Sequence, residues 1–356
     1  MSSTVVGTAA SQSGQPLWGQ AWELTITCAT AGGGSQSTVV SSNAWEPEAL
    51  RVTFDVLQAM NTAPLWYADI SVYNLDEQTA QNIALNASWA TLKAGFQFGS
   101  QISSIIWDGP VFQVLYTREQ VVDQKLTLHC VAVPGDLSTI VNFSMGKFSS
   151  QQQLLARMIQ ETNLPPINPA NGTQGVVASQ RMTATQYPRG NTVFGKVSRF
   201  LAQVADSNQV QAWNDGKQAY VSEADNGNRT PSLIYSPPFP PGGTGNTAGL
   251  PPNTNQSIIG TPQQIQQGVV FTVLLDPRLK VQLPPLLVQL VRTNITLLER
   301  IPNPNDSSGL PTALSSNLLF FAAQVRHTGD TRGNDWHTEV TGWSTAYAQT
   351  LLNLYT

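Results

Sequence analysis

Few side chains in this sequence are of the kinds that perform chemistry. Only three histidines are present, and His327 and His337 lie with Asp330 and Asp335 in the segment RHTGDTRGNDWHTEV. Histidines and carboxylates on one hairpin could bind zinc or another divalent ion. Thr328–Asn334 also has the composition of a polar, glycine-containing turn whose aspartates accept backbone hydrogen bonds. We expect the turn, and we assign no metal ligand, cofactor-binding residue or catalytic residue.

Other catalytic patterns are also missing from the sequence. It has no serine in a nucleophile-elbow context, no CxxC, no HExxH and no phosphate-binding glycine loop. His129 lies next to Cys130 in a strand-like run and is expected to be a packed or solvated strand residue. A glycosidase would need two facing carboxylates roughly 5–10 Å apart, and the spacing of the 22 acidic residues singles out no such pair. We therefore predict that the chain is not an enzyme and needs no cofactor.

Composition points to a protein that packs against other subunits. Charged residues make up 11 % of the 356 residues, whereas about 25 % is usual in soluble proteins. Glutamine, asparagine, serine and threonine replace them, and interface cores are depleted of charge in the same way. A secreted β protein could share this composition. The net charge of −4 gives no support for a nucleic-acid-binding surface, which needs clustered lysine and arginine.

The two cysteines, Cys28 and Cys130, both lie in strand-like runs. Two cysteines do not make a disulfide framework, and we expect buried free thiols, although a bridge between them is left open. Residues 1–15 lack the basic start and apolar core of a signal peptide. No run approaches the roughly 18 apolar residues of a membrane-spanning helix. We expect a chain that is made and used in a cytoplasm or released from one by lysis.

The segment Leu65–Leu85 predicts a strand that leads directly into a capped helix. Apolar residues at every second position from Trp66 to Val72 are typical of a half-buried strand. Asp76 is the expected N-cap of the helix, and Ile83 and Leu85 are its expected apolar face. Residues 1–148 as a whole predict a first β domain with long antiparallel strands, interrupted by a turn or bulge at Trp107–Pro110.

The sequence period then changes to that of helices. Helices are expected over Ser149–Thr162 and Thr192–Asp206, the second with Phe194 on its apolar face. Asn214-Asp215-Gly216 predicts a hairpin, so residues 149–227 indicate a small α/β module. A Pro/Gly-rich loop is expected over 228–264, followed by a second β domain over 265–356. The predicted fold class is mainly β with an α+β insertion, comprising two tube-type antiparallel β-barrel or sheet domains and the small α/β module.

Three blocks resemble a known family when they are taken in order. They are VTFDVLQAMNTAPLWYADISVYNL at 52–75, SSIIWDGPVFQVLYTREQVVDQKLTLHCVA at 103–132, and GVVFTVLLDPRLKVQLPPLLVQL with FFAAQVRHTGDTRGNDWHTEVTG after 268. They resemble baseplate or tail hub proteins of tailed bacteriophages, which are related to the upper hub domains of secretion-system spike proteins. The blocks are structural motifs, and none of them is a catalytic signature.

This resemblance implies a mechanical role. Such hubs are trimers whose chains each contribute two tube-like β domains, so that six similar domains meet the sixfold tail tube while threefold contacts hold the central spike. The partners it implies are two further copies of the chain, the tail tube protein, the spike protein and other baseplate proteins, with transient contact to phage DNA during ejection. The expected location is the baseplate of the virion, assembled in the host cytoplasm.

Two alternatives from other functional classes remain open at this stage. A receptor- or carbohydrate-binding tail protein would use exposed tryptophans such as Trp89 or Trp107 to stack on sugars, but we expect both to be buried. A cell-wall hydrolase would use a carboxylate pair that the sequence does not reveal.

Overall fold

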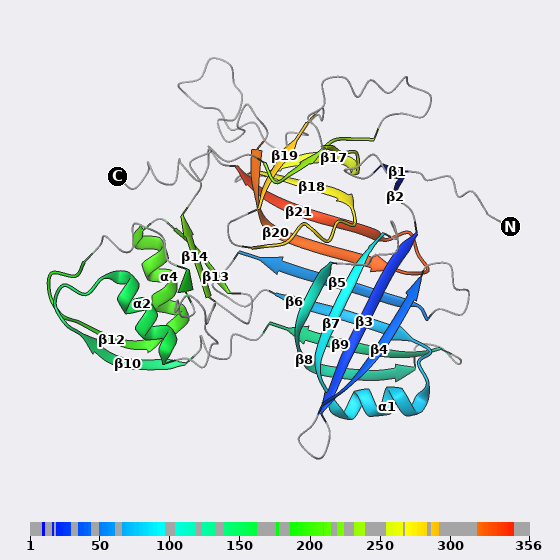
Figure 1. The fold of residues 1–356 in the computed structure, drawn as a ribbon, viewed down its shortest axis with the longest axis horizontal. Helices are drawn as coiled ribbons and strands as arrows, with labels where there is room; N and C mark the ends of the chain where they lie inside the picture. Colours follow the sequence, from blue (N-terminus) through cyan, green and yellow to red (C-terminus); the bar gives the residue numbers. More distant parts are fainter. Residues whose placement is uncertain are drawn as a thin grey trace.

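The computed structural model describes most of the chain, in separate segments. The described residues are 9–10, 16–17, 19–29, 35–43, 50–60, 66–96, 104–118, 123–132, 139–161, 176–177, 186–208, 210–214, 219–223, 231–238, 254–265, 268–282, 286–291 and 319–344. They form a mainly β body and an α/β module that projects from one side of it (Figure 1). The predicted fold class, mainly β with an α+β insertion, is confirmed.

The first half of the β body is an antiparallel array in which alternate side chains are buried. Its strands are β3 (Gln20–Ala29), β4 (Ser35–Asn43), β5 (Val52–Ala59), β6 (Tyr67–Tyr73), β7 (Ala87–Phe96), β8 (Ile105–Arg118) and β9 (Gln124–Val131). They lie in the order β5-β6-β9-β8-β7-β3-β4. The short strands β1 (Ala9–Ala10) and β2 (Pro16–Leu17) pair with each other.

Strand β8 turns the corner between two parts of this array. Its first part, up to Pro110, pairs with β7, and its second part, from Val111, pairs with β9. The register shifts once in each pairing, which marks β-bulges on both sides of the corner. The predicted interruption at Trp107–Pro110 is therefore a bulged corner within one continuous strand, and the alternative of a turn is wrong.

The predicted strand–cap–helix unit is confirmed, with one error in its apolar face. Helix α1 (Glu77–Asn86) begins after Asp76, whose side chain accepts a hydrogen bond from the backbone N–H of Thr79. Ile83 is fully buried, but Leu85 is 83 % exposed. Two residues apart on a helix are about 200° apart around its axis, so Ile83 and Leu85 cannot share one face.

The second half of the β body comes from the C-terminal part of the chain. Its strands are β15 (Leu233–Tyr235), β16 (Thr254–Asn255), β17 (Ile258–Ile265), β18 (Gly268–Leu274), β19 (Leu287–Leu290), β20 (Leu319–Asp330) and β21 (Trp336–Ser344). Strands β15, β16 and β17 fall in the segment 228–264 that was expected to be a loop, so that expectation is wrong for 233–235 and 254–264. Residues 228–230 and 239–253 of the predicted loop lie outside the described residues.

The two halves are joined into one 14-stranded sheet because β20 pairs with both β21 and β5. In Figure 1 the orange strand β20 lies between the red strand β21 and the blue strand β5. Each half has its own hydrophobic core, and each core receives side chains from the other half. Leu275 and Trp336 belong to the first core, while Met60 belongs to the second.

The α/β module contains a two-stranded ribbon, two helices and a small separate sheet. The ribbon is β10 (Ile140–Met145) with β12 (Asn191–Lys196), and the helices are α2 (Gln151–Gln160) and α4 (Val197–Asn208). Strands β11 (Val176–Val177), β13 (Val210–Asn214) and β14 (Ala219–Glu223) form the sheet, and β13 and β14 form the predicted hairpin. Its core is distinct from the cores of the body and includes Val141, Leu154, Met158, Val193 and Leu201.

One predicted helix is too long. Residues 192–196 were expected to be helical, but they belong to β12, and α4 starts at Val197. Pairing with β10 over six residue pairs overrides the local helical period. Phe194 is consequently 71 % exposed on a strand instead of buried on a helix.

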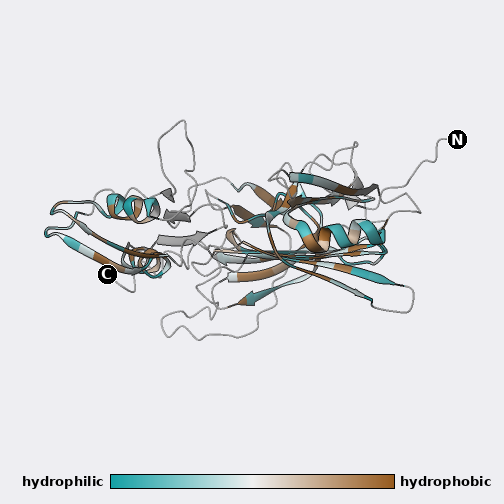
Figure 2. Ribbon diagram, turned by 90° about the horizontal axis from the view of Figure 1, so that it is seen from below, coloured by the Kyte–Doolittle hydropathy of each residue, from teal (hydrophilic) through white to brown (hydrophobic). Residues whose placement is uncertain are grey.

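The module and α1 lie toward opposite ends of the long axis in Figure 1 and again in Figure 2, which is turned by 90°. Among the described residues, no helix is long and apolar enough to cross a membrane.

Candidate functional site

The junction between the two halves of the β body combines strand pairing, ion pairs and aromatic packing. We call this junction the seam and define it as the pairing of β5 with β20 and the side-chain contacts around it. The register runs from Gln324 opposite Ala59 to Asp330 opposite Thr53. Two hydrogen bonds continue it beyond β20, from the N–H of Thr331 to the carbonyl of Val52 and from the N–H of Val52 to Oγ1 of Thr331. The seam thus joins segments that are about 270 residues apart in the sequence.

Two arginine–aspartate pairs clamp the seam at its surface. Arg326 donates two hydrogen bonds to Asp55, of 2.8 and 2.6 Å, and Arg51 donates two to Asp330, of 3.1 and 2.8 Å. The hydrogen bond from Arg51 lowers the pKa of Asp330, and the hydrogen bond with Asp55 raises that of Arg326. Bidentate pairs of this kind fix geometry as well as charge, so the two strands are held in one register.

An aromatic pair fills the space beneath the seam. Phe54 on β5 and Trp336 on β21 make an edge-to-face contact with ring centroids 5.3 Å apart. The indole N–H of Trp336 donates to the carbonyl of Gly95 on β7. Gly329 lies opposite Phe54, and a Cβ atom there would lie 2.2 Å from the Phe54 ring. Glycine is therefore required at this position because the ring occupies the place of a side chain.

A buried glutamine bridges the seam to both halves. Gln58 on β5 is 6 % exposed. Its side-chain amide donates to the carbonyl of Ile106 on β8, and its Oε1 accepts from the N–H of Val281. Both ends of the amide are satisfied, so burying it costs little and fixes the relative position of three chain segments.

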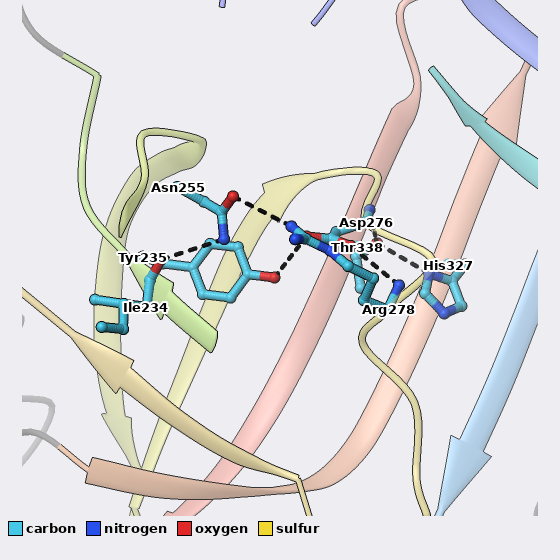
Figure 3. Close-up of polar contacts among 7 residues, drawn as sticks. All are labelled: Ile234, Tyr235, Asn255, Asp276, Arg278, His327 and Thr338. Carbon is cyan, nitrogen blue, oxygen red and sulfur yellow. Dashed lines mark hydrogen bonds and ion pairs between the residues drawn. The ribbon is translucent and has the colours of Figure 1, made fainter. Parts of the chain in front are cut away.

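A buried polar network supports the second half of the body (Figure 3). Asp276 accepts hydrogen bonds from the side chain of Arg278 and from the hydroxyl of Tyr235, the latter at 2.7 Å. Arg278 also donates to Asn255, whose amide in turn donates to the carbonyl of Ile234. Burial opposes ionisation of Asp276, but the hydrogen bonds and charge of Arg278 outweigh it and lower the pKa. Burial, and then the charge of Asp276, raise the pKa of Tyr235 well above its usual range.

His327 extends this network toward the seam. It is fully buried, and its Nε2 lies 3.1 Å from the carbonyl of Leu279 while its Nδ1 lies 2.9 Å from Oγ1 of Thr338. A carbonyl can only accept, so Nε2 carries the proton and Nδ1 accepts from the Thr338 hydroxyl. The same hydroxyl oxygen accepts from the N–H of Asp276. Burial lowers the pKa of His327 to about 4, so at neutral pH the ring is uncharged and acts as a structural linker.

The four residues considered as metal ligands are not brought together. In the β20–β21 pairing, His327 faces Thr338 and His337 faces Thr328, so the two histidines lie on opposite faces of the sheet. Asp330 is bound by Arg51, and its side chain also accepts from the N–H of Arg332, as expected for a polar turn. Within the ranges that the structure describes, no group of three histidine, cysteine or acidic side chains could hold a metal ion.

The remaining residues singled out from the sequence have structural contacts. His129 is paired with Asp69 across β6 and β9 at 2.6 Å. Cys28 and Cys130 are free and buried, and burial raises the pKa of Cys130 to about 12. Trp107 is 3 % exposed, as expected, whereas Trp89 is only half-buried and donates to Asp108.

Comparison with known proteins found similarity to solved structures only. No family model and no curated protein matches the chain. Solved structures do match it. A tail protein from Neisseria meningitidis is 13 % identical with a TM-score of 0.48, covering 93 % of this chain and 99 % of that one. The 43 kDa tail protein of prophage MuSo2 from Shewanella oneidensis is 9 % identical with a TM-score of 0.49, covering 92 % and 99 %.

A type VI secretion system component from Escherichia coli is 8 % identical with a TM-score of 0.41, covering 83 % of this chain and 73 % of that one. That component is itself structurally similar to the tail proteins gp27 and gp5 of bacteriophage T4.

Proposed function

We propose that this chain is a structural hub protein of a tail baseplate, which joins a sixfold tail tube to a threefold central spike as a homotrimer and lines the channel for DNA. Its proposed partners are two further copies, the tail tube protein, the spike protein and other baseplate proteins, with transient DNA contact during ejection. The proposed location is the virion, after assembly in the host cytoplasm. The proposal includes no enzymatic activity and no cofactor.

The seam is the observation that carries the proposal. An adaptor between two symmetries must present two β units in a fixed relation while force passes along the tail. In this chain β5 and β20 place both units in one hydrogen-bonded sheet, and bidentate ion pairs fix the register. The buried groups of the seam and network, including Gln58, Asp276 and His327, are used to hold strands together. This arrangement suits a rigid connector.

The composition supports the same role. A chain with 11 % charged residues has a surface rich in amides and hydroxyls, which can be buried between subunits without the cost of desolvating charges. Rings of β domains also remove exposed strand edges by pairing or covering them.

Electron cryomicroscopy of the assembled particle that contains this chain tests the proposal. We expect threefold density at the tip of the tail tube into which three copies of the β body fit, with the tube on one side and the spike on the other. Finding the chain at another place in the particle, or as a single copy away from the central axis, would contradict the proposal.

A further inference from the structure

The outer face of the β10–β12 ribbon exposes apolar side chains that no described part of the chain covers. Residues alternate strictly along both strands, so that Val141 and Val193 point into the core of the module while Ile140 and Phe194 point outward. Ile140 is 63 % exposed and Phe194 is 71 % exposed. Ile140 lies opposite Lys196, and Phe194 lies opposite Asn142, so the four side chains share the outer face.

The chain segment around this ribbon is basic, in contrast to the rest of the molecule. Residues 139–208 contain six basic and two acidic residues, a net charge of +4. The remaining residues contain twelve basic and twenty acidic residues, a net charge of −8. The ribbon itself has no acidic residue, and Lys147 and Arg189 are exposed at its turn end. Charge complementarity therefore favours an acidic partner surface for this face, and the body of a second copy supplies one.

The flank of α1 has the complementary features. Glu77, Gln81 and Leu85 are spaced by four residues, share one side of the helix and are exposed. Asp76 adds a second exposed carboxylate at the start of the helix, and Leu85, at 83 % exposure, is the most exposed of the large apolar side chains that the structure describes. This flank thus presents an apolar side chain next to acidic ones, as the ribbon presents apolar side chains next to basic ones.

We infer that the outer face of the β10–β12 ribbon docks on the α1 flank of a second copy of this chain. The two surfaces lie toward opposite ends of the molecule (Figures 1 and 2). A contact between two different surfaces is head-to-tail and builds a ring when its rotation closes, whereas a twofold dimer would need one surface that matches itself. This inference rests on the proposed hub function, because it names the surfaces through which the copies would meet.

Sedimentation velocity of the full-length chain, from micromolar concentration upward, tests the docking. Phe194→Ser and Leu85→Ser should each weaken self-association by about tenfold or more, as expected when a central apolar side chain of an interface is removed. Ile259→Ser is the matched control, because Ile259 is an exposed apolar residue at 46 % on β17, outside both surfaces. It should leave association unchanged, and circular dichroism should show that all three variants are folded.

A charge exchange makes the test specific for this pair of surfaces. Lys196→Glu and Glu77→Lys should each weaken association, and the double variant should recover most of it because the attraction is restored with opposite signs. Weakening by each single variant without recovery in the double variant would show that the two side chains do not face each other and would overturn the assignment.

The remaining outcomes separate this inference from the proposed function. A wild-type chain that associates as strongly as its Phe194→Ser and Leu85→Ser variants would overturn the docking surfaces and leave the hub function standing. A wild-type chain that stays monomeric at every concentration would overturn self-docking, and the position of the chain in the particle would still decide the hub function. Binding of the ribbon to a single-stranded oligonucleotide, lost in Phe194→Ser while association is unchanged, would assign the face to nucleic acid instead.

Discussion

The seam and the β10–β12 ribbon both pair strands from separate parts of the chain, but they are built in opposite ways. The inner side of the seam is filled by Phe54, Trp336 and the hydrogen-bonded amide of Gln58, whereas its outer side carries the ion pair of Arg326 with Asp55. The ribbon is covered on one side only, and its other side exposes Ile140 and Phe194. We conclude from this difference that the seam is an internal junction that sets the shape of the body. The ribbon, in contrast, exposes a surface to which another protein surface can bind.

Removing the buried carboxylate of Asp276 should lower the free energy of unfolding more than any other change to the seam and its network. Asp276→Ala removes the acceptor for the buried hydroxyl of Tyr235 and for the backbone N–H of Arg278, and each such loss costs about 1–3 kcal/mol. The Arg278 side chain is 40 % exposed and can turn to water, so its charge adds little to this cost. We expect the free energy of unfolding, measured in urea, to fall by the sum of these two losses. Asp335→Ala, at an exposed position of the same region, should change it by less than about 0.5 kcal/mol. If both variants lost the same free energy of unfolding, the network around Asp276 would not stabilise the body as described.

Acid should weaken the body through His327. Its pKa is lowered from 6.5 to about 4 in the folded protein, so the unfolded chain binds the proton more readily between these values. The contribution of the uncharged His327 ring to the free energy of unfolding is complete above about pH 6.5. It is lost as the pH falls toward 4, by roughly 3 kcal/mol in total at 1.36 kcal/mol per pKa unit.

Urea unfolding at a series of pH values measures this dependence. His327→Gln should be less stable than the wild type at pH 7 and should lose the His327 part of the slope between pH 6.5 and 4. An identical slope in the variant and the wild type would show that another group is responsible.

Adding a methyl group at Gly329, against the Phe54 ring, should destabilise the seam directly. Gly329→Ala places a Cβ atom where the ring lies, and overpacking of this kind typically costs about 1–3 kcal/mol. Gly146→Ala, in the module, is the control, because nothing lies within 4 Å of the added atom. Thermal unfolding should show a lower midpoint for Gly329→Ala only. A tolerated alanine at 329 would mean that the strands are not held as closely as described.

The surface ion pairs of the seam should have the smallest effect. Arg326 and Asp55 are 47 % and 27 % exposed, and exposed pairs usually contribute about 0.2–1 kcal/mol. A double-mutant cycle over Arg326→Ala and Asp55→Ala, measured by urea unfolding, should give a coupling energy in this range that shrinks in added salt. A coupling energy that is large and independent of salt would show that the pair is buried in the assembled form.

Local features of the fold could be predicted well from the sequence. Residues close together in the chain determine the period of two in β5 and β6, the cap at Asp76 and the β13–β14 hairpin. These features can therefore be predicted without the structure. The class of fold followed from these elements and their order.

Features that depend on distant pairing could not be predicted. Nothing in the pattern of 52–59 indicates that it will pair with 324–330, and β12 has a helical period that only the pairing with β10 overrides. The buried network could not be predicted for the same reason, because Asp276 and Arg278 alone have the composition of an ordinary polar turn. The signal that could have pointed to it is Tyr235 and His327, polar residues within otherwise apolar strand patterns.

Hydrogen exchange followed by mass spectrometry, on wild type and Asp276→Ala, tests most directly whether the seam makes the two halves one body that is distinct from the module. We predict that the substitution raises exchange together in β5, β6, β20 and β21 while leaving α2 and α4 unchanged, because the network supports the joined sheet and the module has its own core. Faster exchange confined to the strands after residue 231, with β5 and β6 as protected as in the wild type, would contradict this claim.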